Sequence, residues 1–414
     1  MSTRRVRVHV PSMLDDTSVR RVSRPKRRFL FVVPPLTGHV NPNVAVAAEL
    51  AERGHKVAWA GHRAALEPLL PSGSRIHGTL DRDFAARLPA LQDAWLGLRG
   101  HATVRFLWEE FAVPLGHAMM PGVLTAVDRF RPDAVVCDQI TLAGPVAARL
   151  REIPWASSVA ACTEVARPLA GTPKVERWVR DRIDGFQRAH GIEDALDLRF
   201  SDHLVLVFTT AALMGDVSEF PEHYAFVGPA LGRPAGSTFP WEWLDGRPAV
   251  LVTLGTLNGP SGERFYRVAA DAVRGMDVQA ILVAPPALAA RAGLGDPPPN
   301  VLVRHHVPQL DLLPRLSAVV CHGGHTTVCE TLANGLPLVV APIRDDQPIV
   351  ARQVEAAGAG IAVRFSRVRA EELAAALTTV LADGPHRAAA RRVRDSFAAA
   401  GGAAEAADRL EKLT

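Results

Sequence analysis

The stretch from residue 322 to residue 347 combines the turns and side chains that a phosphate-binding site needs. It reads HGGHTTVCETLANGLPLVVAPIRDDQ, and its pattern predicts a strand that ends before His322 and a helix that begins near Thr326. The free N–H groups at a helix start, together with the positive end of the helix dipole, favour bound anions. The His322 imidazole and two threonine hydroxyls would add hydrogen-bond donors. We therefore expect a diphosphate site in this turn.

A purely structural interpretation of this stretch is equally good when it is taken alone. Thr327 and Glu330 have the spacing of a capping box, in which the two side chains only satisfy backbone groups at a helix start. The residue types therefore leave both interpretations open at this point.

His39 is the candidate for proton transfer. It lies in GHVNP, residues 38–42, at the end of a loop that follows a predicted strand. A histidine with an ordinary pKa of about 6.5 can accept a proton at neutral pH. The structural alternative is a histidine that caps a helix beginning at Asn41 and Pro42.

A D-x-D triplet occurs at Asp81, Arg82 and Asp83. In one class of transferases such a triplet binds a metal and a diphosphate. Here it lies in the N-terminal half, far along the chain from residues 322–347. We therefore expect a solvated loop at the triplet and no metal site.

Strands and helices alternate along the chain and must position these candidates. The order from Arg28 is RRFLFVV, the loop PPLTGH, an amphipathic stretch from Pro42 to Arg53 and the strand KVAWA, which predicts a βαβ unit. The order restarts at Ala249 with AVLVT, a Gly-containing turn and a helix from about Glu263. The strands QAILVA, NVLVR, AVVCH and PLVVAPI follow. Such alternation predicts two doubly wound parallel sheets.

The length of 414 residues also favours two domains, because a single hydrophobic core stops growing beyond roughly 250–300 residues. Ligands of open α/β sheets bind at the carboxyl ends of the strands, so two such domains would share one cleft. The predicted segments are a disordered basic leader at 1–26, an N-terminal domain at 27–230, a linker at 231–248, a C-terminal domain at 249–395 and a C-terminal helix at 396–414 that packs back toward the N-terminal domain.

Charge and the length of the apolar stretches argue against nucleic-acid-binding and membrane-spanning proteins. Nine of the 47 basic residues lie within residues 1–28 with two of the 43 acidic ones, so the rest of the chain is slightly acidic. We therefore expect no nucleic-acid binding. No stretch approaches the ~20 apolar residues of a membrane span, so we expect no stable membrane insertion. The leader could be a plain extension or a docking arm, and a homodimer is left open.

The four cysteines are too few and too scattered for a disulfide framework or a zinc site, which favours a cytoplasmic enzyme. They are Cys137, Cys162, Cys321 and Cys329.

Two separate motifs resemble those of one enzyme family. The run HVPQLDLLPRLSAVVCHGGHTTVCETLANGLPLVVAPIRDDQ, residues 306–347, resembles the donor-binding signature of family 1 nucleotide-sugar glycosyltransferases. The GHVNP motif resembles that family's acceptor-site motif. The similarity extends in outline over residues 27–414, includes the VTLGT turn at 252–256, and is nearest to bacterial transferases that act on macrolides and other natural products. It implies the GT-B fold, in which two Rossmann-like doubly wound parallel-sheet domains face each other across a cleft.

The resemblance also implies a role for each matching residue. His39 would be the general base and Asp138 the carboxylate that orients it, although Asp138 could instead cap a helix. Glu330 would bind the ribose hydroxyls, and His306 stands where plant members have a tryptophan that stacks on the base. The nucleotide and its diphosphate would contact Thr256, His306, Val307, His322, Gly324, Thr326, Thr327 and Glu330. The transferred sugar would contact Asp346 and Gln347.

The reaction implied by the resemblance is an inverting, metal-independent transfer of a hexose. The donor would be a UDP- or dTDP-sugar bound by residues 249–395, and the acceptor a hydroxyl of a small apolar natural product bound by residues 27–230. No cofactor is expected besides the nucleotide-sugar co-substrate. The polar groups of Asp346 and Gln347 favour a fully hydroxylated hexose, as in UDP-glucose, over a dideoxy sugar. The alternatives are a nucleotide-sugar epimerase of the same fold and a catalytically inactive partner of another transferase.

Two aromatic segments of the N-terminal half, residues 91–111 and 154–165, could line an apolar acceptor pocket. Their spacing slightly favours the helix core instead. The aromatic residues concerned are Trp95, Phe106, Trp108 and Trp155.

Overall fold

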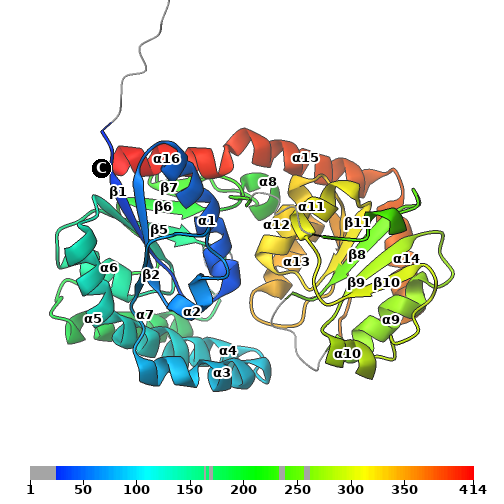
Figure 1. Cartoon of the computed structure of the whole chain (residues 1–414), viewed down its shortest axis with the longest axis horizontal. Coiled ribbons are helices and arrows are strands. Elements are labelled where there is room, and N and C mark those ends of the chain that lie inside the picture. The colour runs from blue at the N-terminus through cyan, green and yellow to red at the C-terminus, as the bar shows by residue number, and fades with distance from the viewer. Residues whose placement is uncertain (1–24, 163–164, 167–170, 233–237, 256–261) are drawn as a thin grey trace, which may run out of the picture.

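The structure is a computed structural model that describes residues 25–162, 165–166, 171–232, 238–255 and 262–414. Most of the expected leader, part of the expected linker and Thr256 lie outside the described residues. Two parallel sheets, each flanked by helices, form two lobes that lie side by side (Figure 1). The predicted α/β class with two doubly wound sheets is confirmed.

Sheet A belongs to the N-terminal half and has the strand order β3-β2-β1-β4-β5-β6-β7, with every pair parallel. Leu30 of β1 packs into the core on one face of this sheet, and Phe31 packs into the core on the other face. Burial on both faces explains why these strands are apolar throughout rather than alternating. The strands are β1 (Arg28–Val32), β2 (Lys56–Gly61), β3 (Ile76–Gly78), β4 (Ala134–Asp138), β5 (Trp155–Val159), β6 (Leu204–Val207) and β7 (Tyr224–Phe226).

The helices of this half are mostly the crossovers that parallel strands require. A π-helical segment, Leu107–Ala112, joins two of them. The helices are α1 (Thr37–Glu52), α2 (Arg63–Leu66), α3 (Arg82–Leu96), α4 (His101–Phe106), α5 (Val113–Phe130), α6 (Ala143–Arg149), α7 (Pro173–Ala189) and α8 (Ala211–Met214).

Sheet B belongs to the C-terminal half and repeats the design with the order β10-β9-β8-β11-β12-β13, again all parallel. Its strands are β8 (Ala249–Thr253), β9 (Gln279–Val283), β10 (Val301–Arg304), β11 (Ala318–Cys321), β12 (Leu338–Val340) and β13 (Gly360–Ala362). Its helices are α9 (Glu263–Val273), α10 (Pro286–Arg291), α11 (Gln309–Leu312), α12 (His325–Ala333), α13 (Gln347–Ala356) and α14 (Ala370–Leu381).

The last two helices, α15 (Pro385–Ala400) and α16 (Gly402–Leu413), run from the C-terminal lobe onto the N-terminal lobe (Figure 1). Gly401 separates them with a φ of +87°, a conformation that glycine adopts without a Cβ penalty. Leu410 of α16 is fully buried in the core beside α1. The C-terminal helix therefore ties the two halves together.

The first helix begins earlier than the sequence pattern predicts. We expect it at Pro42, but α1 begins at Thr37 and contains Pro42 in its second turn. Proline lacks only its own N–H donor, so one hydrogen bond near the helix end is lost while the rest of the helix persists. His39 consequently lies in the first turn of α1 and not in a loop.

The strand order reverses at equivalent places in the two sheets, between β1 and β4 in sheet A and between β8 and β11 in sheet B. Such switch points leave a crevice at the carboxyl ends of the strands, where ligands of open α/β sheets bind. His39 follows β1 and Asp138 ends β4, whereas His322 follows β11. The fold therefore directs both groups of candidate residues to switch points.

Truncation of Leu410 tests the attachment of α16. Leu410→Ala should lower the free energy of unfolding by ~2–5 kcal/mol, because it removes a fully buried side chain and leaves a cavity. Leu150→Ala removes the same atoms from a leucine that is 38% exposed and should change stability little. Chemical denaturation followed by circular dichroism measures both, and equal effects would contradict the packing described here.

Candidate functional site

His39 and Asp138 form a hydrogen-bonded pair at the switch point of sheet A. His39 Nδ1 lies 2.9 Å from Asp138 Oδ2, and the Asp138 side chain is fully buried whereas the His39 side chain is 19% exposed. Asp138 Oδ1 accepts a further hydrogen bond from the backbone N–H of Ile140 at 3.1 Å. An ionised carboxylate can only accept, so Nδ1 carries the proton and Nε2 keeps a free lone pair.

Asp138 does not cap a helix. The next helix, α6, begins at Ala143 and its N-cap is Leu142. The helix-cap alternative for Asp138 is therefore wrong, and its carboxylate serves the histidine and the turn that follows β4.

The surroundings of His39 favour its protonated form. Burial of the imidazole opposes protonation, but the charge and hydrogen bond of Asp138, and the charge of Asp346, outweigh it and raise the pKa of His39 above 6.5. Asp346 belongs to the other half of the chain. The pKa of His39 therefore depends on both halves.

The turn after β11 holds His322 between two glycines. A Cβ atom on Gly324 would lie 2.5 Å from His322 Nε2, and one on Gly255 would lie 2.7 Å from His322 Cε1. Gly323 has a φ of +88°, which a residue with a side chain rarely adopts. The three glycines thus allow the backbone to approach the imidazole closely on the edge where β8 and β11 end.

His322 is neutral in this structure. Burial and the nearby charge of Arg344 lower the pKa of His322 to about 4, although a backbone contact with Thr253 acts in the opposite direction. Its Nδ1 is buried and has no hydrogen-bond partner among the described residues. An anion would favour the charged imidazolium, so this side chain is suited to a negatively charged ligand.

The predicted capping box is absent, since α12 begins at His325 with Gly324 as its N-cap and no side chain caps it. Thr327 therefore lies within the first turn. Thr326 points toward the other half, because a Cβ on Gly38 would lie 3.9 Å from its hydroxyl oxygen. The first turn of α12 thus lies close to the first turn of α1, where His39 lies.

Glu330 lies one turn further along α12 and is mostly buried. Burial raises its pKa to about 7, against the opposing effect of a hydrogen bond from Gln309 Nε2. Gln309 begins α11, only two residues after Val307. It is a site residue that the sequence prediction missed, although it lies inside the quoted signature.

The start of α13 holds the residues expected at the sugar. Gln347 Oε1 accepts hydrogen bonds from the backbone N–H groups of Ile343, at 2.9 Å, and Arg344, at 3.1 Å. The amide oxygen is therefore committed to the turn, and the amino group remains for a ligand. Asp346 is the N-cap residue of α13.

His306, expected at the base, and Val307, expected at the nucleotide, differ in exposure. His306 is exposed in the loop after β10, whereas Val307 is 5% exposed and belongs to the core of the C-terminal half. Thr256 lies outside the described residues.

Comparison with known proteins identifies the chain. Residues 268–413 match the family described as erythromycin biosynthesis protein CIII-like, C-terminal domain. Demethyllactenocin mycarosyltransferase of Streptomyces fradiae is 30% identical over 92% of this chain and 86% of the relative. The chain belongs to the family 1 glycosyltransferases of the GT-B fold.

Further comparisons agree with this family. The 4'-demethylrebeccamycin synthase of Lentzea aerocolonigenes is 28% identical to this chain, over 93% of this chain and 99% of the relative. Among solved structures, the glycosyltransferase of kitacinnamycin is similar with a TM-score of 0.74 and 24% identity, over 94% of this chain and 99% of that chain. The spinosyn rhamnosyltransferase complexed with thymidine diphosphate has a TM-score of 0.71 and 24% identity, over 93% and 100%.

The aromatic residues of the glycosyltransferase divide into two groups. Trp108 and Trp155 are at most 2% exposed and belong to the core, as their spacing suggests. Trp95 and Phe106 are only partly buried. Trp95 Nε1 donates a hydrogen bond of 3.3 Å to Asp345 Oδ1, a contact between the two halves that no local sequence pattern indicates.

The D-x-D triplet of the glycosyltransferase is the start of a helix and not a solvated loop. Asp81 is the N-cap of α3 and accepts a 2.7 Å hydrogen bond from the backbone N–H of Phe84. Among the described residues, no group of three or more His, Cys, Asp or Glu side chains is placed to hold a metal ion. In that same part of the chain, no helix is long and apolar enough to span a membrane.

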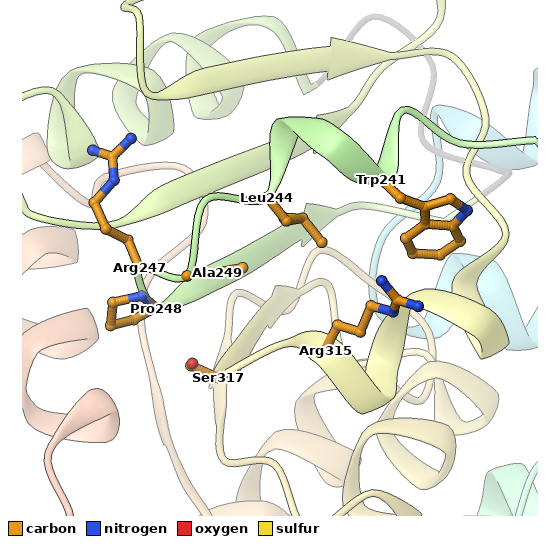
Figure 2. Close-up of a pocket in the computed structure, with 8 residues that line it drawn as sticks. Trp241, Leu244, Arg247, Pro248, Ala249, Arg315 and Ser317 are labelled. Carbon is orange, nitrogen blue, oxygen red and sulfur yellow. The ribbon is translucent and has the colours of Figure 1, made fainter.

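A cavity of about 390 Å³ lies at the opposite end of sheet B from the candidate site (Figure 2). It is bounded by Ala249 at the start of β8 and by Ser317 directly before β11. Arg315 lies over the Trp241 ring, with its guanidinium carbon 4.4 Å from the ring centroid. Since the donor motif follows the carboxyl ends of these strands, this cavity is separate from the site.

Gly324→Ala tests the His322 turn. The new Cβ should displace the imidazole at a cost of about 1–3 kcal/mol, as overpacking of a tight site does. We expect the affinity for UDP or dTDP, measured by isothermal titration calorimetry, to fall roughly tenfold. Gly185→Ala in α7, where a Cβ would meet no atom within 4 Å, is the control and should bind as the wild type does. Unchanged binding by Gly324→Ala would remove this turn from the nucleotide site.

Proposed function

We propose that this glycosyltransferase moves a hexose from a UDP- or dTDP-sugar onto a hydroxyl of a small apolar natural product, with inversion and without a metal ion. The N-terminal half, residues 27–230, binds the acceptor, and residues 249–395 bind the donor. The observation that carries the proposal is the His39–Asp138 hydrogen bond opposite the N-terminus of α12.

His39 serves as the general base in this proposal. Asp138 holds Nδ1–H, so Nε2 can accept the proton of the acceptor hydroxyl. The acceptor oxygen forms a bond to the anomeric carbon as the bond from that carbon to the diphosphate oxygen breaks. The imidazolium that results is stabilised by the buried Asp138 carboxylate. Attack on the face opposite the leaving group inverts the configuration at the anomeric carbon.

The leaving nucleoside diphosphate is stabilised by the C-terminal half. The N-terminus of α12 directs N–H groups toward it, and His322 can gain charge as negative charge develops. Arg344 supplies a fixed positive charge close to His322. In other transferases a metal ion stabilises the negative charge of the leaving diphosphate. These groups can supply that stabilisation here, which supports the metal-independent proposal.

The substrate classes are supported by similar proteins. The relatives described above are named a mycarosyltransferase and a synthase. One spinosyn rhamnosyltransferase structure is a complex with thymidine diphosphate, and another is a complex with the spinosyn aglycone. Other curated relatives and structural neighbours are named as transferases, which favours neither an epimerase nor an inactive partner. We further propose a cytoplasmic location, supported by four buried, unpaired cysteines.

The test begins with a mass-spectrometric screen of UDP-glucose and dTDP-deoxyhexoses against a panel of natural-product acceptors. With the best pair, His39→Ala should lower turnover by ~10²–10⁴-fold and leave donor affinity nearly unchanged.

Because the unprotonated imidazole is the base, wild-type turnover should fall as the pH drops through a pKa above 6.5. Asp138→Asn should move that acid limb to lower pH, since it removes the charge that raises the pKa.

Two outcomes would contradict the proposal. Turnover of His39→Ala close to that of the wild type at neutral pH would exclude His39 as the base. Loss of activity in excess EDTA, restored by magnesium or manganese, would exclude the metal-independent mechanism. A nucleotide sugar epimerised in the absence of any acceptor would favour the alternative enzyme class.

Glu330 should make nucleotide affinity depend on pH. If its carboxylate accepts hydrogen bonds from the ribose hydroxyls, the ionised form binds, and a pKa of about 7 in the free enzyme means that affinity weakens as the pH falls below 7. Calorimetric titration of UDP and dTDP between pH 5.5 and pH 8.5 measures this.

Glu330→Gln separates the effect of Glu330 from the titration of the nucleotide's own phosphate. This variant keeps the shape of the side chain but cannot titrate, so its affinity should vary less with pH than that of the wild type. The same pH dependence in both proteins would show that the ribose does not bind an ionised Glu330.

A further inference from the structure

Three consecutive residues at the end of the 322–347 stretch contact three different parts of the enzyme. Arg344 lies close to His322 and lowers its pKa, and Asp346 raises the pKa of His39. Asp345, between them, accepts the hydrogen bond from Trp95 Nε1 at 3.3 Å. The segment therefore joins the diphosphate turn, the catalytic base and the aromatic helices of the N-terminal half.

Asp345 has an unusual backbone conformation. Its φ of +54° is left-handed, a conformation uncommon for residues other than glycine, asparagine and aspartate. Its carboxylate also lies 3.5 Å from Arg344 Nε, and the Arg344 side chain is only 5% exposed. Asp345 is therefore held from both sides, by an arginine of its own half and by the indole of the other half.

Trp95 has rigid surroundings of its own. It lies near the end of α3, and its ring packs against Phe106, with centroids 5.7 Å apart, and Phe111, at 5.5 Å. Phe111 is fully buried in the π-helical segment that precedes α5. Such π-helical turns are often found at functional sites. A tryptophan fixed in this way can hold the segment that it contacts.

We propose that Trp95 is a positioning residue: its indole N–H holds Asp345 and thereby sets the place of Asp346 opposite His39. This inference rests on the proposed function, because it assigns Trp95 a part in the transfer carried out by His39. Trp95 would couple the N-terminal aromatic helices, which lie on the acceptor-binding half, to the position of the donor sugar.

The two partners can be changed with little other disturbance. Trp95→Phe removes the N–H donor and keeps a ring against Phe106 and Phe111. Asp345→Gly removes the acceptor oxygen and fits the left-handed backbone, whereas Asp345→Asn fits that backbone and retains Oδ1 as an acceptor.

Trp95→Phe and Asp345→Gly should each lower kcat roughly 3–10-fold, the equivalent of one hydrogen bond, with donor Kd nearly unchanged. The double variant should lose little more than either single one, because both remove the same contact. Asp345→Asn should restore most of the activity lost in Asp345→Gly. Trp241→Phe, a change at the tryptophan that lines the separate cavity (Figure 2), should behave as the wild type does.

A second measurement distinguishes positioning from general damage to the fold. NMR titration of the His39 ring should show a lower pKa in Trp95→Phe than in the wild type, since Asp346 would no longer be held near the imidazole. The inference fails if this pKa is unchanged, if the losses of the two variants add fully, or if Asp345→Asn is as impaired as Asp345→Gly. Failure of the proposed function would look different, because His39→Ala would then keep its turnover.

Discussion

The hydrogen bond between His39 and Asp138 is the interaction on which the rest of this enzyme depends. A carboxylate with a fully buried side chain is costly unless its oxygens accept hydrogen bonds. Here one oxygen is satisfied by the turn at Ile140 and the other by the imidazole. The contact exists because β1 and β4 are neighbours, although 99 residues separate the two side chains in the sequence. The strand order is thus a requirement of the proposed chemistry.

The two sides of the site have opposite electrostatic character. On the side of α1, Asp138 and Asp346 surround the base with negative charge and favour the imidazolium that the reaction would generate. On the side of α12, His322 is neutral and the pKa of Glu330 is about 7, so burial holds both groups close to neutrality. Together with Arg344 and the helix terminus, this second side is suited to a dianionic ligand. The separation favours movement of a proton toward one side and of negative charge toward the other.

Much of this arrangement could be predicted from the sequence because it is local. Strand, turn and helix follow one another in the same order in both halves, and His39 and His322 each lie between a strand and the body of the helix that follows it. The start of α1 was misplaced because proline usually marks the first turn of a helix, whereas Pro42 lies in the second. The partner of the Gln347 side-chain oxygen could not be predicted either, since an amide oxygen can accept a hydrogen bond from a ligand or from nearby backbone N–H groups. Only the folded turn decides between them.

The contact between Trp95 and Asp345 could not be predicted from any pattern, since 250 residues separate the partners and they belong to different halves. Its consequence for the active site follows from chain geometry. Asp345, which has a left-handed φ, contacts Trp95 of the N-terminal half, while Asp346 raises the pKa of His39 and Arg344 lowers the pKa of His322. Neither half alone therefore holds a complete site. One run of three residues thus contains the carboxylate that adds to the effect of Asp138 on the pKa of His39 and the carboxylate that contacts the N-terminal half.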